Sequence, residues 1–230
     1  MTTQLKIDFV SDVSCPWCVV GLRALDQALA RIHNDLKEDV QVELRFQPFE
    51  LNPHMPAEGQ DITEHIIEKY GITPAQAEAN RENIRQRGAE LGFTFSGSNA
   101  AGGGRSRIYN TFDAHRLLHW AELENLDQQK ALKEALFAAY FTDGQSPGSH
   151  ALLVTLAGQV GLSTERARQI LASEEFADDV RAREAYYTER GIRSVPAVII
   201  NDQHLISGGQ PVEVFEQAIR QIAQAHRAGM

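Results

Sequence analysis

The chain begins with a succession of apolar and polar patterns that predicts a strand, a helix and a second strand. Residues 5–10 are largely apolar, which is typical of a strand covered on both faces. Apolar residues then recur at intervals of three and four between positions 19 and 32, which predicts an amphipathic helix. Residues 40–46 alternate between apolar and polar types, as in a strand with one covered face. Together these segments predict a β-α-β unit.

The pattern changes after about residue 58, where strand signals give way to helical ones. Asp61 and Thr73 are typical helix-start residues, and Gly71 ends the first of the segments that they begin. Helical periodicity then continues to about residue 190, and we expect residues 59–191 to form an all-helical insertion. The expected helices after residue 91 cover residues 108–124, 127–140, 149–160, 164–171 and 174–190.

Strand signals return after Gly191. Residues 195–200 are apolar and rich in β-branched types, and the turn dipeptide Asn201-Asp202 joins them to residues 204–207 as a predicted hairpin. A final amphipathic helix follows Pro211. The fold class is therefore α/β, with β-α-β and β-β-α halves. The expected domains are residues 1–58 with 192–230, and the insertion, residues 59–191.

Composition and charge argue against two classes of function, nucleic-acid binding and membrane spanning. An apolar fraction of 43% with 23% charged residues is typical of a globular chain with a core. The net charge of −9 disfavours a nucleic-acid partner, because such binding depends on clustered Lys and Arg. No run of eighteen apolar residues predicts a membrane span, and no signal peptide precedes the first strand. We therefore expect a cytoplasmic protein.

Both cysteines of the 230-residue chain lie in Cys15-Pro16-Trp17-Cys18, between the first strand and its helix. Pro16 suits the first helical position, which makes Cys15 the expected N-cap. A thiolate there is stabilised by unpaired N–H groups and the helix dipole, whereas Cys18 lies one turn inside and should be more sheltered. Cys15 is thus the predicted nucleophile and Cys18 the resolving thiol. A metal half-site is the alternative, but structural zinc needs four ligands.

Two other segments have weaker chemical signals. His115 and His119 have metal-ligand spacing, but the residues between them lack the glutamate of a zinc protease, and we expect no metal site. We expect instead that His115 or Asn110 lines a groove above the cysteines. The glycine-rich segment 96–107 lacks the Gly-Lys-Ser/Thr ending of a phosphate-binding loop and is interpreted as a connector.

Three motifs occur in order along the chain: Ser11-Asp12-Val13-Ser14-Cys15-Pro16-Trp17-Cys18, Asn110-Thr111-Phe112-Asp113-Ala114-His115-Arg116, and Ser194-Val195-Pro196 with the later Ser207-Gly208-Gly209-Gln210. In sequence and order they resemble the DsbA family of thioredoxin-fold oxidoreductases, and more narrowly its FrnE-like branch. The resemblance spans nearly the whole chain. It implies a thioredoxin-like fold with a helical insertion and a cis Val195-Pro196 bond beside the dithiol.

The resemblance also implies a function. We expect a thiol-disulfide oxidoreductase that acts as a reductase or isomerase on protein or small-molecule thiols and disulfides. No cofactor beyond the redox-active disulfide is expected, and glutathione is a candidate co-substrate. A homodimer is left open. The alternatives are a glutathione-dependent transferase of the kappa class, a 2-hydroxychromene-2-carboxylate isomerase, and a non-enzymatic holdase-like module. The residues expected at the site are Cys15 and Cys18 as catalytic thiols, with Pro16, Trp17, Val195, Pro196, Asn110 and His115 contacting substrate.

Overall fold

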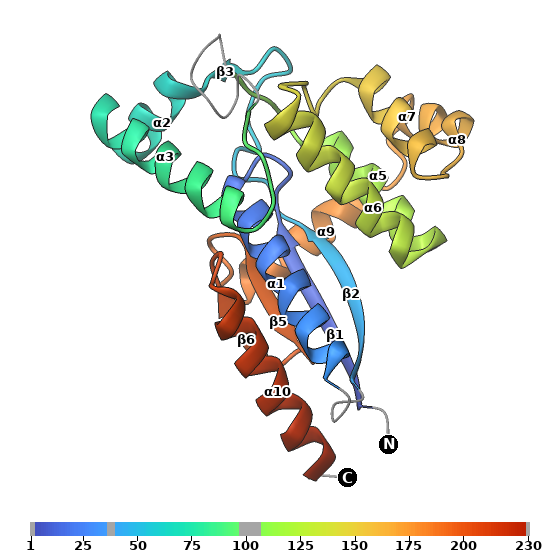
Figure 1. The fold of residues 1–230 in the computed structure, drawn as a ribbon. Helices are drawn as coiled ribbons and strands as arrows, with labels where there is room; N and C mark the ends of the chain where they lie inside the picture. Colours follow the sequence, from blue (N-terminus) through green and yellow to red (C-terminus); the bar gives the residue numbers. More distant parts are fainter. Residues whose placement is uncertain (1–2, 36–39, 97–106, 229–230) are drawn as a thin grey trace.

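A computed structural model of the chain describes residues 3–35, 40–96 and 107–228. Its centre is a four-stranded sheet in the order β2-β1-β5-β6 (Figure 1). β1 and β2 pair in parallel, whereas β5 pairs antiparallel with both β1 and β6, so the predicted β-α-β and β-β-α halves meet between β1 and β5. The strands are β1 (Thr3–Ser11), β2 (Val40–Pro48), β5 (Ala197–Ile200) and β6 (His204–Ser207).

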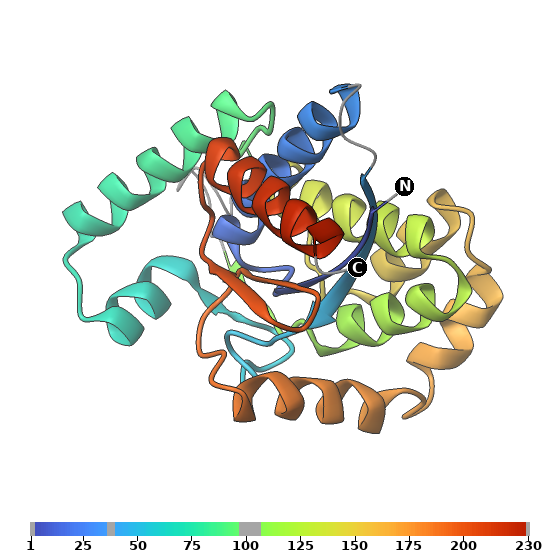
Figure 2. The ribbon, with the colours of Figure 1, turned by 90° about the horizontal axis from the view of Figure 1, so that it is seen from below.

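Helices cover both faces of this sheet, which is why β1 is buried along most of its length (Figure 2). On one face lie α1 (Pro16–Asn34) and α10 (Val212–Ala228), whose buried residues include Leu25 and Phe215. On the other face Tyr187, from α9 (Ala177–Glu189), packs with Val10 and Ala197. No helix in the described part of the chain is long and apolar enough to cross a membrane.

The β5–β6 hairpin turns through the predicted dipeptide. Asn201 and Asp202 have φ values of 52° and 57°. Two consecutive residues with positive φ match the twist of the flanking strands, and Asn and Asp tolerate this conformation better than other side chains. The prediction is therefore confirmed for β6 and for the turn chemistry, whereas β5 begins at Ala197 instead of residue 195.

The insertion is largely helical, but it also holds a short strand pair. β3 and β4 pair antiparallel, so the expectation of an all-helical insertion was wrong at this point, and α5 begins at residue 112 instead of 108. Most of the glycine-rich segment, residues 97–106, lies outside the described residues. The elements are β3 (Gln60–Asp61), α2 (Ile62–Tyr70), α3 (Pro74–Glu90), β4 (Arg107–Ile108), α5 (Phe112–Glu124), α6 (Leu126–Phe137), the π-helix η1 (Ala138–Thr142), α7 (His150–Gln159) and α8 (Thr164–Leu171).

Helix α6 attaches the insertion to the sheet through a buried amide. The Oε1 atom of Gln129 accepts the N–H of Phe46 at 3.0 Å, and its Nε2 donates to the Phe46 carbonyl at 2.9 Å. Because Phe46 belongs to the edge strand β2, Gln129 satisfies backbone groups that no further strand pairs. The insertion therefore completes the sheet edge, while the domain boundaries at residues 58 and 192 stay a prediction.

Candidate functional site

The cysteines lie where β1 ends and α1 begins. Cys15 is the N-cap of α1, with φ −94° and ψ 113°, and Pro16 occupies the first turn. The Cys15 N–H donates to the Asp12 carbonyl at 3.3 Å, and the Cys18 N–H donates to the Cys15 carbonyl at 3.1 Å. The backbone thus holds the two thiols one helical turn apart, and they are not bonded to each other.

The surroundings of Cys15 come from the far end of the sequence. Its Sγ lies 3.6 Å from the Val195 carbonyl oxygen, and the Val195-Pro196 bond is cis, as the family resemblance implied. The residue is 4% exposed, whereas Cys18 is fully buried. Cys15 is therefore the more accessible of the two sulfurs, and the 195–196 segment lies next to it.

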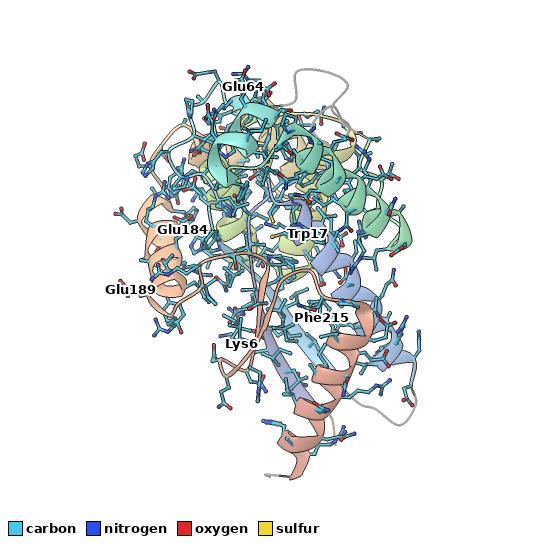
Figure 3. All side chains as sticks on the ribbon, turned by 90° about the vertical axis from the view of Figure 1, so that its left-hand side faces the viewer. Lys6, Trp17, Glu64, Glu184, Glu189 and Phe215 are labelled. Carbon is cyan, nitrogen blue, oxygen red and sulfur yellow. The ribbon has the colours of Figure 1, made fainter. Side chains whose placement is uncertain are left out.

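Two glycines allow this close packing around the cysteine turn. A Cβ atom on Gly21 would lie 2.9 Å from Cγ of Pro196, and one on Gly209 would lie 3.0 Å from the Trp17 carbonyl oxygen. Trp17 itself is half-buried and lies between the insertion helices above it and Phe215 below it (Figure 3). The predicted residues Trp17 and Pro196 are thus brought to one end of α1, next to Cys15.

Asp12 fixes the turn before Cys15. Its buried carboxylate accepts the N–H of Leu51 at 2.7 Å and the N–H of Ser14 at 3.2 Å, and Nε2 of His115 lies 3.6 Å from its Oδ1. Burial opposes ionisation, but the His115 imidazole and the two N–H groups outweigh it and hold the pKa of Asp12 below its ordinary value. Asp12 is therefore an ionised anchor beneath the dithiol.

His115 and Asn110 both lie near the start of α5, and their contacts differ. The His115 side chain is buried behind the cysteine turn, against Asp12. Asn110 precedes α5, where its Oδ1 accepts the Phe112 N–H at 2.9 Å and its Nδ2 donates to the Met55 carbonyl. His115 thus contacts the turn before Cys15, whereas Asn110 joins the start of α5 to the segment around Met55, and a substrate contact of Asn110 stays a prediction.

The histidine pair does not form a metal site. His119 packs edge-on against Phe176 with the ring centroids 5.2 Å apart, away from the Asp12 contact of His115. Within residues 3–35, 40–96 and 107–228, no three or more His, Cys, Asp and Glu side chains are grouped as metal ligands. His115 and His119, although four residues apart, thus have different neighbours.

Sequence reasoning missed a fully buried lysine behind Cys18. Lys133 of α6 has no hydrogen-bond partner for its Nζ, and its ammonium interacts with the charges of Cys18, Asp12 and Cys15. Burial lowers the pKa of Lys133 to about 8, and burial together with Cys15 raises the pKa of Cys18 well above its ordinary value. A lysine within an amphipathic pattern gives no local signal of burial, since most lysines lie on the surface.

Sequence reasoning also missed the end of α2, which lies on the Cys15 side. Lys69 donates from Nζ to the Leu51 carbonyl and to Oδ1 of Asn52, each at 2.7 Å. Burial lowers the pKa of Lys69, while Asp12 and Cys15 oppose that shift. The neighbouring Tyr70 is 59% exposed, and its pKa is raised by burial and by Cys15. A cation and an exposed aromatic ring thus lie within electrostatic reach of Cys15.

Comparisons with known proteins agree with this arrangement. A structure described as a probable DsbA oxidoreductase from Streptomyces coelicolor is 33% identical, has a TM-score of 0.83, and the match covers 96% of this chain and 90% of that one. The uncharacterised protein YwbO of Bacillus subtilis is 28% identical over 95% of this chain and 96% of its own length. The cytosolic disulfide reductase DsbM from Pseudomonas aeruginosa, with GSH, is 14% identical with a TM-score of 0.64, covering 95% and 99% of the two chains. The family model for the DSBA-like thioredoxin domain matches residues 6–220, and the chain therefore belongs to this family.

Proposed function

We propose that the protein is a thiol-disulfide oxidoreductase that uses Cys15 as nucleophile and Cys18 as resolving thiol. The observation that carries the proposal is the asymmetry of the dithiol: Cys15 lies at the helix N-terminus against the Val195 carbonyl, and Cys18 is fully buried one turn behind. An external disulfide can meet only the first sulfur, and the second is placed to attack from inside.

The reaction consists of two exchanges. The Cys15 thiolate attacks one sulfur of a substrate disulfide, breaks the S–S bond, and forms a mixed disulfide while the first substrate thiolate leaves. Cys18 then loses its proton and attacks the Cys15 sulfur, which releases the second substrate thiolate and leaves a Cys15–Cys18 disulfide. The substrate gains two electrons and the protein dithiol loses two. Two molecules of a small thiol, for which we propose glutathione, reduce the Cys15–Cys18 disulfide back to the dithiol and leave as their own disulfide.

Reduction or isomerisation is the proposed direction, in the cytoplasm and within the FrnE-like branch. A reducing compartment keeps Cys15 and Cys18 as a dithiol, which favours reduction of protein or small-molecule disulfides over net oxidation. The fold neighbour named as a cytosolic disulfide reductase with GSH supports the same direction. The dithiol itself is the redox centre, and the proposal includes no metal or organic cofactor.

A single-turnover assay with a fluorescent disulfide peptide tests the proposal. Cys15→Ser should lower the rate by at least about 10³-fold, because the remaining thiol, Cys18, is fully buried. Cys18→Ser should form a stable mixed disulfide that mass spectrometry detects. Unchanged turnover in both variants would contradict exchange chemistry and favour a glutathione-dependent isomerase or a binding module. A reduction potential measured in glutathione buffer then gives the direction.

A further inference from the structure

Lys133 lies in an environment that ordinarily excludes lysine. Its side chain is fully buried, its Nζ has no hydrogen-bond partner within the described part of the chain, and it lies 5.0 Å from the centroid of the Phe137 ring. Burying a charged amine without a partner costs several kcal/mol in general. A buried, unpaired amine therefore calls for an explanation beyond packing.

A second lysine on the same helix has an ordinary environment and serves as a comparison. Lys130, one turn earlier in α6, reaches the surface and forms an ion pair with Asp26 at 2.6 Å. Lys133 instead lies on the face of α6 that also buries Gln129 and Leu136. The burial of Lys133 thus comes from its position on the inner face of α6, beside Phe137, which belongs to the same buried cluster as Cys15 and Cys18.

The groups that face Lys133 come from α1 and from the turn before it. They are the thiols of Cys18 and Cys15 and the carboxylate of Asp12, and His115 of α5 lies behind that carboxylate. Each of the three favours the ammonium form, while burial disfavours it and leaves the pKa of Lys133 at about 8. Near neutral pH the amine can therefore both hold and release a proton.

Asp12 is a weaker candidate for proton uptake. Two backbone N–H groups and His115 already stabilise its carboxylate, and these contacts hold its pKa below the ordinary value. A base of low pKa accepts a proton poorly from a thiol whose own pKa is raised, as that of Cys18 is. Lys133 has the better match in proton affinity.

We propose that Lys133 is the group that takes up the proton of Cys18 when Cys18 resolves the mixed disulfide on Cys15. The inference rests on the proposed exchange function. The neutral amine accepts the proton as the Cys18 sulfur forms its bond to Cys15, the bond from Cys15 to the substrate sulfur breaks, and the substrate leaves as thiolate. The ammonium stabilises the developing Cys18 thiolate on the way. In the reverse direction, when a thiol opens the Cys15–Cys18 disulfide, Lys133 returns the proton to the Cys18 sulfur.

Reduced protein mixed with an aromatic disulfide such as Ellman's reagent separates the two exchanges, because each releases one coloured thiolate. The first phase is attack by Cys15 and the second is resolution by Cys18. Lys133→Met should leave the first phase unchanged and slow the second by about 10²-fold or more. The second phase of the wild-type protein should rise with pH through about 8 and then level off, and this inflection should be lost in the variant.

Lys130→Met is the matched control on the same helix, and both of its phases should equal those of the wild-type protein. Lys133→Gln, which keeps a polar side chain, should repeat the effect of Lys133→Met. A wild-type second phase in both Lys133 variants would overturn the inference, as would equal slowing of both phases, which would indicate a structural defect. A wild-type protein without a second phase would instead contradict the exchange function itself.

Discussion

Cys15 and Cys18 are one helical turn apart, yet their surroundings are built by two different regions. The thioredoxin-like half places the Val195 carbonyl against Cys15, whereas the helical insertion supplies the charge of Lys133, which acts on Cys18. The insertion also acts on Cys15, through Lys69 at the end of α2 and through Lys133. An insertion of this kind therefore contributes to the electrostatics of both thiols.

The largest expected effect comes from removing the Gln129 amide, which joins α6 of the insertion to strand β2. Gln129→Leu leaves the N–H and carbonyl of Phe46 and the carbonyl of Leu118 without the amide that now binds them. Each buried group that loses its partner costs about 1 to 3 kcal/mol, so urea denaturation should show a loss of about 3 to 5 kcal/mol.

Gln128→Leu is the control for that variant. The Gln128 amide binds only within the insertion, at the Gly161 and Val160 carbonyls, and is partly accessible to water. Its loss should cost about 1 kcal/mol or less. Equal losses in the two variants would show that Gln129 does not have a special role at the sheet edge.

Lys133→Met should produce the next largest change in the free energy of unfolding, and this change should be an increase. The lysine has a lower pKa in the folded chain than in the unfolded chain, so the unfolded state binds more protons between the two values. The destabilisation caused by burying the Lys133 ammonium is fully present below about pH 8 and disappears toward pH 10.5. The variant should be more stable than wild type by about 2 to 3 kcal/mol at pH 7, and that advantage should shrink as the pH rises above 8. A destabilised variant would contradict the cost assigned to the buried charge.

Asp12→Asn, in the turn before Cys15, should change the free energy of unfolding by less. The lowered pKa of Asp12 means that its ionised form stabilises the fold above the ordinary value of 3.8, and that this contribution is lost as the pH falls through the lower folded value. Thermal unfolding at pH 7 should show a loss of about 1 to 2 kcal/mol, because the amide offers one acceptor where the carboxylate offers two. The difference between variant and wild type should narrow in acid, and a constant difference would rule out the charge as its cause.

The sequence predicted the parts of the fold that have local signals. The apolar run of β1, Pro16 at the start of α1 and the Asn201-Asp202 turn each specify their own backbone. β3 and β4 had no such signal, because two residues cannot show a period and the pairing of Gln60 with Ile108 joins distant segments. Helix α9 begins at residue 177 instead of 174 because Phe176 adopts a left-handed conformation, φ 63°, that its residue type does not predict.

The candidate site divides in the same way. Cys15 and Cys18 could be identified from their spacing and from the proline between them. The burial of His115 and Lys133 depends on how α5 and α6 pack against the cysteine turn, and no residue near them in the sequence reports that packing. Interior charges of an inserted domain therefore need a structure, whereas the nucleophile at a helix start does not.

The backbone contacts of Leu51 matter for experiments that exchange the insertion between relatives. Its N–H is bound by Asp12, next to the cysteines, and its carbonyl is bound by Lys69, at the end of α2. A chimera that exchanges the insertion of this chain for that of a relative would therefore need a cation at position 69 to keep the loop after β2 in place. Without that cation, the exchanged helices could fold correctly while Leu51 moved away from the carboxylate of Asp12.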